Sequence, residues 1–172
     1  MNQGVHTVDL IQWLAGGGQS VMGMFGVFGH EIEAEDQTVA LFKFKNGALG
    51  TIYTTTCCYP GLDQLITIYG QNGSVLKDAS KLLSWNIQGE NEKEEEAEML
   101  AQFGAKKDKE AGISADPMAV SSDGHTVIIE DLVEAIQEDR DPMIGLESAR
   151  HAVEIINAVF ESGRTGREVE VK

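Results

Sequence analysis

The sequence predicts an α+β fold, in which helices pack on one face of an open, mixed and largely antiparallel β-sheet. Three patterns predict it: a helix-period apolar segment near the N-terminus, glycine-punctuated strand-like runs in the centre, and two helix-period segments near the C-terminus. The chain has 172 residues, the length of one domain with a sizeable core. We therefore expect a single domain over residues 1–172.

The first element expected is a helix that ends before Gly16. Apolar residues recur there at every third position: Val5, Val8, Ile11 and Leu14. This spacing lines one face of a helix, and the glycines at 16–18 end it in the manner of a glycine C-cap. A phosphate-binding glycine loop follows a strand, whereas these glycines follow a helix. We therefore interpret them as a helix terminator and expect no nucleotide site there.

The central region predicts four or five strands joined by tight turns. Residues 21–28 are apolar but interrupted by glycine, which is consistent with a strand or an extended connection. Two strand-like runs follow in residues 38–56, around Asn46-Gly47, a pair that suits a type I′ turn because both central residues need positive φ. Residues 65–76 repeat the pattern around Gln71-Asn72-Gly73, and residues 81–87 can close the sheet. Such short connections favour antiparallel pairing.

Two more helices are expected after a polar, Glu- and Lys-rich excursion at about 88–120. The first is capped by Ser122 or Asp123, ends before Pro142, and has one apolar face: Ile128, Ile129, Leu132, Val133 and Ile136. The second covers about 146–161 and turns four residues inward: Ala149, Val153, Ile156 and Phe160. Residues 167–171 alternate and can return to the sheet as an edge strand.

The predicted sheet is apolar on both faces. In residues 51–56 and 65–69, bulky or β-branched side chains occupy both alternating sets of positions. Since the predicted helices cover only one face, we expect the other face to be available for a homo-oligomer, a dimer or a tetramer.

The composition argues against nucleic acid and membranes as binding partners. The chain has 28 acidic and 13 basic residues, a formal net charge of −15, which repels nucleic acid and anionic membrane surfaces. Its apolar runs are shorter than the roughly 20 residues of a membrane span, and no signal-peptide pattern stands at the N-terminus. Cys57 and Cys58 are adjacent and have neither metal-site spacing nor a disulfide partner, so we interpret them as sheet residues of a cytoplasmic protein.

His6 and Asp9 are the first candidate functional residues. They lie three positions apart on one helix face, so their side chains can meet. A histidine with a reference pKa of ~6.5 suits proton transfer, and the alternative is a solvated histidine at a helix start. Together with Asn2 they make a poor set of metal ligands, and His30 lies beyond a glycine-rich connection. We therefore expect no metal site.

Four segments in order resemble the C-terminal domain of the Gfo/Idh/MocA (glucose–fructose oxidoreductase / inositol dehydrogenase) family: residues 2–17, 35–52, 60–75 and 124–171. The resemblance implies an enzyme of two domains. An N-terminal Rossmann domain binds NAD or NADP, and a C-terminal mixed-sheet domain supplies substrate contacts and the oligomer interface. It also implies transfer of a hydride between the nicotinamide and a hydroxyl or carbonyl carbon of a sugar, an inositol or a related polyol.

The family's G-x-H-x-x-D-L motif is matched by Gly4, His6, Asp9 and Leu10. By this resemblance His6 is the catalytic acid/base residue, and Asn2, His6 and Asp9 bind substrate. Many dehydrogenating members carry an Asp four residues before the histidine, where this chain has Asn2. An asparagine can hydrogen-bond a sugar hydroxyl but cannot accept its proton.

The family's dinucleotide fingerprint and its Glu-Lys-Pro lysine belong to the N-terminal domain. We therefore expect no cofactor-binding residue in this chain, no NAD or NADP bound by this chain alone, and no activity of the chain alone. On this reading Met1 is an internal methionine of a longer enzyme. The alternative is a self-standing, non-catalytic binding or oligomerisation module of the same fold. The coding sequence upstream of Met1 distinguishes the two.

Overall fold

The computed structural model describes residues 4–59, 61, 64–78, 81–104 and 123–172. The chain divides into two compact units, Met1–Cys58 with Ser121–Lys172 and Tyr59–Val120. In the described residues every pairing between named strands is antiparallel, and both sheets are open. The predicted α+β class is thereby confirmed. The predicted cap Ser122 and residues 105–120 of the excursion lie outside the described residues.

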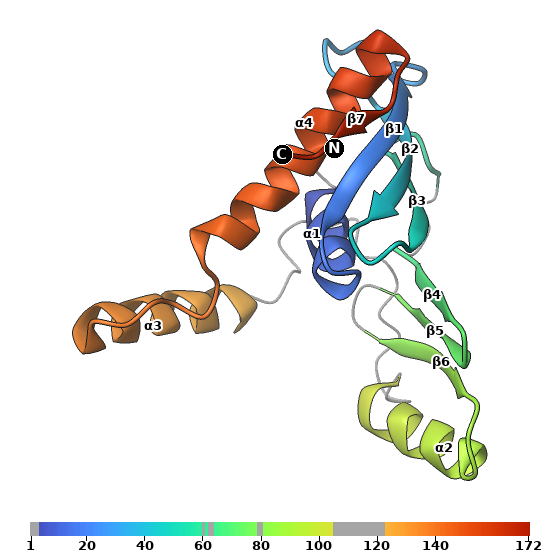
Figure 1. Ribbon diagram of the computed structural model, residues 1–172, viewed down its shortest axis with the longest axis vertical. Helices are drawn as coiled ribbons and strands as arrows, with labels where there is room; N and C mark the ends of the chain where they lie inside the picture. The colour runs from blue at the N-terminus through green and yellow to red at the C-terminus, as the bar shows by residue number, and fades with distance from the viewer. Residues whose placement is uncertain (1–3, 60, 62–63, 79–80, 105–122) are drawn as a thin grey trace. The chain divides into compact units, whose positions relative to one another are not determined.

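The first unit contains a sheet in the order β3-β2-β1-β7. Its described strands are β1 (Gly18–Gly26), β2 (Gln37–Phe44), β3 (Leu49–Thr55) and β7 (Val169–Glu170). Its described helices are α1 (Val5–Leu14), α3 (Asp123–Glu138) and α4 (Leu146–Thr165). α4 lies along β1 and also contacts α1 (Figure 1). The edge strand predicted at the C-terminus is confirmed as β7, which pairs with β1.

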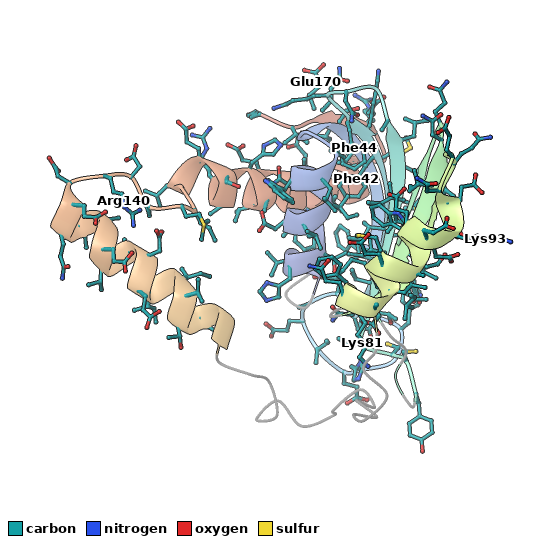
Figure 2. All side chains as sticks on the ribbon, turned by 90° about the horizontal axis from the view of Figure 1, so that it is seen from below. Phe42, Phe44, Lys81, Lys93, Arg140 and Glu170 are labelled. Atoms are coloured by element: carbon teal, nitrogen blue, oxygen red, sulfur yellow. The ribbon has the colours of Figure 1, made fainter. Side chains whose placement is uncertain are left out.

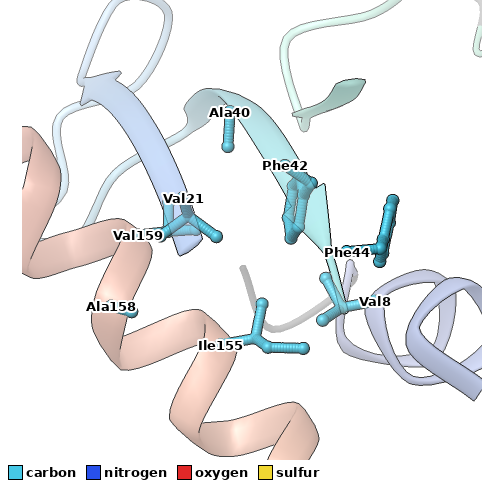
Figure 3. Close-up of a cluster of buried hydrophobic side chains, with 8 residues drawn as sticks. All are labelled: Val8, Val21, Ala40, Phe42, Phe44, Ile155, Ala158 and Val159. Atoms are coloured by element: carbon cyan, nitrogen blue, oxygen red, sulfur yellow. The ribbon is translucent and has the colours of Figure 1, made fainter. Parts of the chain in front are cut away.

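The core of this unit lies between the sheet and the two helices α1 and α4. β2 alternates strictly, with Ala40, Phe42 and Phe44 buried and Val39 and Leu41 exposed. The buried cluster is drawn in Figure 3: Val8, Val21, Ala40, Phe42, Phe44, Ile155, Ala158 and Val159. One face of the sheet is thus covered by helices, as the alternation along a strand requires.

The face that α4 turns to the sheet agrees only in part with the one predicted, since Ile156 packs against the core but Ala149 is exposed. Val153 is 52% exposed, whereas the buried residues are Ala152, Ile155, Ala158, Val159 and Ser162. The reason is the closeness of β1: a Cβ atom on Gly23 would lie 2.8 Å from Val159 Cγ1 and 2.9 Å from its carbonyl oxygen. Small side chains permit this approach, whereas the sequence pattern favoured the bulkiest residues as the buried ones.

The turn between β2 and β3 also differs from the type I′ turn predicted. The Phe44 N–H donates to the Ala48 carbonyl and the Gly47 N–H donates to the Phe44 carbonyl, both at 2.9 Å. Gly47 has a φ of 88°, but among the described non-glycine residues only Asp139 has a positive φ. Asn46 instead accepts a hydrogen bond from the Ala48 N–H at 2.9 Å through its side chain. This is a three-residue hairpin loop with glycine in the left-handed position.

In the second unit, β4 (Ile66–Gly70), β5 (Gly73–Lys77) and β6 (Leu82–Ile87) form a sheet of their own. We expected these strands to continue the first sheet. They pair with one another through short connections, whereas residues 56–65 between β3 and β4 are too many for a tight hairpin. α2 (Glu92–Phe103) packs on β6, where Trp85 Nε1 donates to Glu95 Oε1 at 3.0 Å.

α3 ends before Pro142 as predicted, at a turn closed by Arg140 (Figure 2). The guanidinium contacts Asp131 at 3.0 Å, Glu134 at 3.5 Å and Glu138 at 2.9 Å. The predicted apolar face of α3 is exposed: Ile128, Ile129, Leu132, Val133 and Ile136. Over the described residues, no helix is both long enough and apolar enough to cross a membrane.

The connection between β1 and β2 is held by the buried carboxylate of Asp36. It accepts hydrogen bonds from the backbone N–H groups of Phe28 and Gly29 at 2.8 Å and of His30 at 3.0 Å. Burial raises the pKa of this carboxyl, but the hydrogen bonds from Gly29 and Phe28, with those from the side chains of Cys57 and His30, outweigh burial. The pKa of Asp36 is therefore held well below its usual range.

Asp36→Asn is expected to destabilise the chain in a pH-dependent way. A carboxyl whose pKa is lowered by folding stabilises the protein above its unfolded pKa of about 3.9, and this contribution is lost as the pH falls toward the folded value. The difference in free energy of unfolding between wild type and Asp36→Asn should be largest near neutral pH and shrink below about pH 4. Urea unfolding over a pH series measures it, and a constant difference would contradict this role.

Candidate functional site

The start of α1 carries two of the predicted site residues. α1 begins at Val5, after Gly4 as N-cap, and buries Val8 and Gln12 against the core. His6 and Asp9 are both exposed. Because Val8 belongs to the same buried cluster as α4 and β2, the core fixes which side of α1 carries these two polar residues.

Asp9 is oriented by a neighbour on the same helix. Gln12, only 6% exposed, donates a hydrogen bond from Nε2 to Asp9 Oδ1 at 3.2 Å. The contact that the structure gives Asp9 is therefore with Gln12, one turn further on, while the imidazole of His6 is presented to solvent. Asn2, the third predicted site residue, lies outside the described residues.

The glycines after α1 do not form a dinucleotide cradle. Gly16 and Gly17 have φ values of 77° and 94°, and they connect α1 to β1 in the order helix, glycine, strand. The Gly17 N–H donates to the Gln12 carbonyl at 2.7 Å, and the Gly18 N–H donates to Nε2 of His151 at 3.0 Å. These amides already have partners within the chain, and the order is opposite to that of a phosphate-binding loop. The segment therefore ends α1 and does not fit NAD or NADP.

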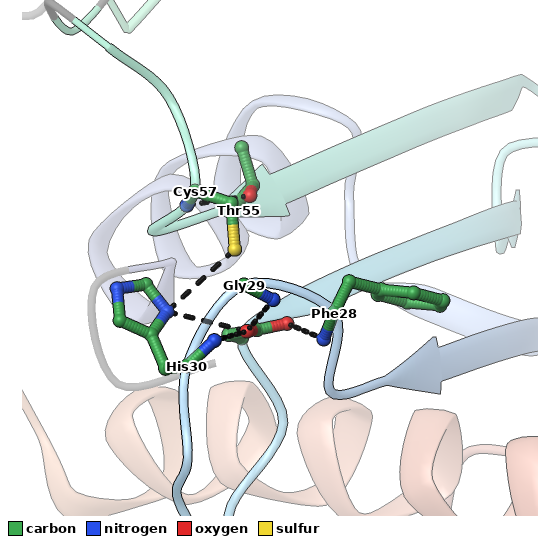
Figure 4. Close-up of polar contacts among 6 residues, drawn as sticks. Phe28, Gly29, His30, Thr55 and Cys57 are labelled. Carbon is green, nitrogen blue, oxygen red and sulfur yellow. Dashed lines mark hydrogen bonds and ion pairs between the residues drawn. The ribbon is translucent and has the colours of Figure 1, made fainter.

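A second polar cluster stands at the end of the four-stranded sheet, where His30, Asp36 and Cys57 meet (Figure 4). His30 Nδ1 lies 3.2 Å from Asp36 Oδ2 and 3.6 Å from Cys57 Sγ. Asp36 has a side chain with no exposed surface, while the His30 side chain is 45% exposed and Cys57 is exposed. One buried anion is thus approached by two accessible side chains.

The geometry of this cluster does not fit a nucleophilic triad. In such a triad the carboxylate and the nucleophile bind different nitrogens of the histidine, whereas here both are closest to Nδ1 of His30. Burial, and next the hydrogen bond to Asp36, raise the pKa of the Cys57 thiol. A raised pKa keeps the thiol protonated and unreactive at neutral pH.

Spacing along the chain does not reveal this cluster, because its members belong to two connections that are distant in sequence. β1 and β3 both pair antiparallel with β2, so their carboxyl ends lie at the same end of the sheet. Gly26, Gln37 and Thr55 are opposite one another there, so the residues after β1 and after β3 converge on Asp36. The register of β1 and β3 on β2, which the sequence pattern does not specify, is what brings these residues together.

The comparisons with known proteins agree on one family. The family model described as "Oxidoreductase family, C-terminal alpha/beta domain", of the Gfo/Idh/MocA type, matches residues 1–171. The comparison with curated proteins found no match.

Solved structures of dehydrogenases share the fold over the whole chain. The WlbA dehydrogenase of Chromobacterium violaceum, solved with NADH and UDP-GlcNAcA, is 26% identical with a TM-score of 0.77, and the match covers 100% of this chain and 45% of that one. The Bordetella pertussis WlbA dehydrogenase, with the same ligands, is 24% identical with a TM-score of 0.74, covering 100% and 44%.

A levoglucosan dehydrogenase, solved with NADH and levoglucosan, is 19% identical with a TM-score of 0.70, covering 97% of this chain and 48% of that one. This chain therefore spans about half the length of the solved structures that it matches. Since the family model covers almost every residue, the chain belongs to the Gfo/Idh/MocA oxidoreductase family and corresponds to its C-terminal α/β domain.

Proposed function

We propose that this chain is the substrate-binding and oligomerisation half of an oxidoreductase that transfers a hydride between NAD or NADP and a sugar, an inositol or a related polyol. The observation that carries the proposal is the exposed His6 on the first turn of α1, within a chain that matches the oxidoreductase C-terminal domain. The sugar substrate is supported by the nucleotide sugar and the levoglucosan with which the similar dehydrogenases were solved.

In this proposal the chain's own residues bind and orient the substrate. His6 hydrogen-bonds the reacting oxygen and exchanges a proton with it, because an imidazole nitrogen can either donate or accept one. Asp9, held by Gln12, accepts a hydrogen bond from a neighbouring hydroxyl, and Asn2 contacts another. The hydride chemistry would be supplied by a nicotinamide bound to a separate N-terminal domain, since the glycines that end α1 do not fit a dinucleotide.

The chain alone is expected to show no dehydrogenase activity. The purified 172-residue chain would be mixed with NAD or NADP and a panel of sugars and inositols, and nicotinamide absorbance would be followed. We expect no change above the rate without protein. Turnover by the chain alone would contradict the claim that the cofactor is bound elsewhere.

His6→Ala in the full-length enzyme is expected to lower kcat by about 10²–10⁴-fold, the usual contribution of a general acid/base. Steady-state kinetics of the purified wild type and variant measures the loss. His125→Ala, which removes an exposed histidine from α3, is the matched control and should retain the wild-type rate. A His6→Ala enzyme of normal rate would restrict His6 to a structural role.

The uncovered face of the four-stranded sheet supports self-association. On this face, cross-strand register aligns Met24, Val39 and Tyr53 in one row and Met22 with Leu41 in the next. All five side chains are exposed, from 42% for Val39 to 74% for Met24. A contiguous apolar surface of this kind marks an interface, and we propose that a dimer or tetramer buries it.

Leu41→Lys is expected to weaken that association. A lysine in the middle of the face would leave a charge buried without a partner in the oligomer, while in the single chain the position is exposed. Light scattering over a concentration series should give a lower mass for this variant than for the wild type. Glu161→Lys, which adds positive charge at an exposed position of α4, should leave the mass unchanged. A wild type that is monomeric at high concentration would refute the interface.

A further inference from the structure

We propose that His30, Asp36 and Cys57 form a binding site for Zn²⁺ at the end of the β1-β2-β3 sheet. Imidazole nitrogen, carboxylate oxygen and cysteine sulfur are the three ligand types that zinc takes in proteins. Their potential ligand atoms all lie within 4.8 Å of one another. This site differs from the expectation of no metal, because the cluster joins residues from two connections that are separate in sequence.

Two of the three distances between the ligand atoms fit a tetrahedral ion. Bond lengths of about 2.3 Å to sulfur and about 2.0–2.1 Å to nitrogen and oxygen place sulfur about 3.6 Å from nitrogen, and nitrogen about 3.3 Å from oxygen. The structure has 3.6 Å between Cys57 Sγ and His30 Nδ1, and 3.2 Å between that nitrogen and Asp36 Oδ2. The third pair, Cys57 Sγ and the Asp36 carboxylate, lies within 4.8 Å.

Gly29 leaves the space in which the sulfur lies. A Cβ atom at this position would stand 2.7 Å from Cys57 Sγ and 3.3 Å from Cys57 Cβ. Any side chain there would displace the thiol from His30 and Asp36. The backbone of the β1–β2 connection is thus shaped around the cluster, with its N–H groups on Asp36 and an open position beside Cys57.

The charges of the site favour a cation, and its ligands favour zinc over magnesium or calcium. Asp36 has a side chain with no exposed surface, so its negative charge is poorly screened by water, and the same connection carries Glu31, Glu33 and Glu35. Magnesium and calcium take oxygen ligands, whereas thiolate and imidazole together select zinc and similar transition metals. The exposed His30 and Cys57 give the ion a path from solvent.

Binding would release the thiol proton of Cys57 to solvent and leave the proton of His30 on Nε2, so that sulfur and Nδ1 both offer lone pairs. Three protein ligands leave a fourth position for water. The ion would link the connection after β1 to Cys57, shortly after the end of β3. It is remote in sequence from His6, and the proposal does not depend on the proposed function.

The test uses Co²⁺ as a spectroscopic substitute for Zn²⁺. The purified, reduced chain would be titrated with Co²⁺, then with Zn²⁺. We expect the near-ultraviolet band of a cobalt–thiolate bond and the visible bands of tetrahedral cobalt. These bands should reach their maximum at one equivalent of cobalt and disappear when zinc is added. Zinc should also raise the midpoint of thermal unfolding, because it binds only the folded cluster.

Cys57→Ser and Cys58→Ser are the matched pair. Cys57→Ser should abolish the thiolate band. It should also weaken zinc binding by more than about 10–100-fold, which is the usual effect of removing a residue that only hydrogen-bonds a metal ligand. Cys58→Ser should keep the band and the affinity. His30→Ala should weaken binding as Cys57→Ser does, and far-ultraviolet circular dichroism of the metal-free variants checks that each is folded.

Two results would overturn the site. One is the absence of a cobalt–thiolate band in the reduced, folded wild-type chain. The other is zinc binding of equal strength in wild type, Cys57→Ser and His30→Ala, which would mean that the ion associates with the acidic surface in general.

Discussion

The close approach of α4 to β1 at Gly23 is the contact on which the rest of the first unit depends. The Gly23 N–H donates to Ser162 Oγ at 2.9 Å, and that hydroxyl donates to the Arg167 carbonyl at 2.6 Å. Ser162 is fully buried and so joins strand, helix and the segment leading to β7. A larger residue at position 23 would meet the backbone of α4, so the whole helix would have to move away from the sheet.

The position of α1 follows from that contact. Ile155 and Val159 are completely buried and share one cluster with Val8 of α1. A second link comes from His151, whose Nε2 accepts from the Gly18 N–H at 3.0 Å directly after the glycines that end α1. α4 thus fixes both the apolar side of α1 and its exit into β1, and thereby orients the helix that carries His6.

The fold class, most elements and their order could be predicted, because apolar periodicity records which face of each element is buried. The face of α4 could not be predicted from hydrophobicity, since Ala152, Ala158 and Ser162 are buried for their small size. The loop at Asn46-Gly47 could not be predicted either, because the backbone N–H of Ala48 donates to the Asn46 side chain in a turn one residue longer.

The candidate site residues could also be predicted only in part. His6 and Asp9 follow from local spacing and from the family motif, whereas the partner that holds Asp9 is Gln12, a polar residue on the buried side of α1. The cluster of His30, Asp36 and Cys57 requires the strand register, because its members come together only after β1 and β3 have paired with β2.

The proposal that this chain is the substrate half of a larger oxidoreductase is tested most directly by a crystal structure of that proposed enzyme with NADH bound. We expect the nicotinamide ring to face the first turn of α1, with His6 across a space that one sugar ring can fill. A nicotinamide that lies away from α1, with His6 in solvent or covered by another part of the protein, would contradict the assignment of this chain as the substrate half.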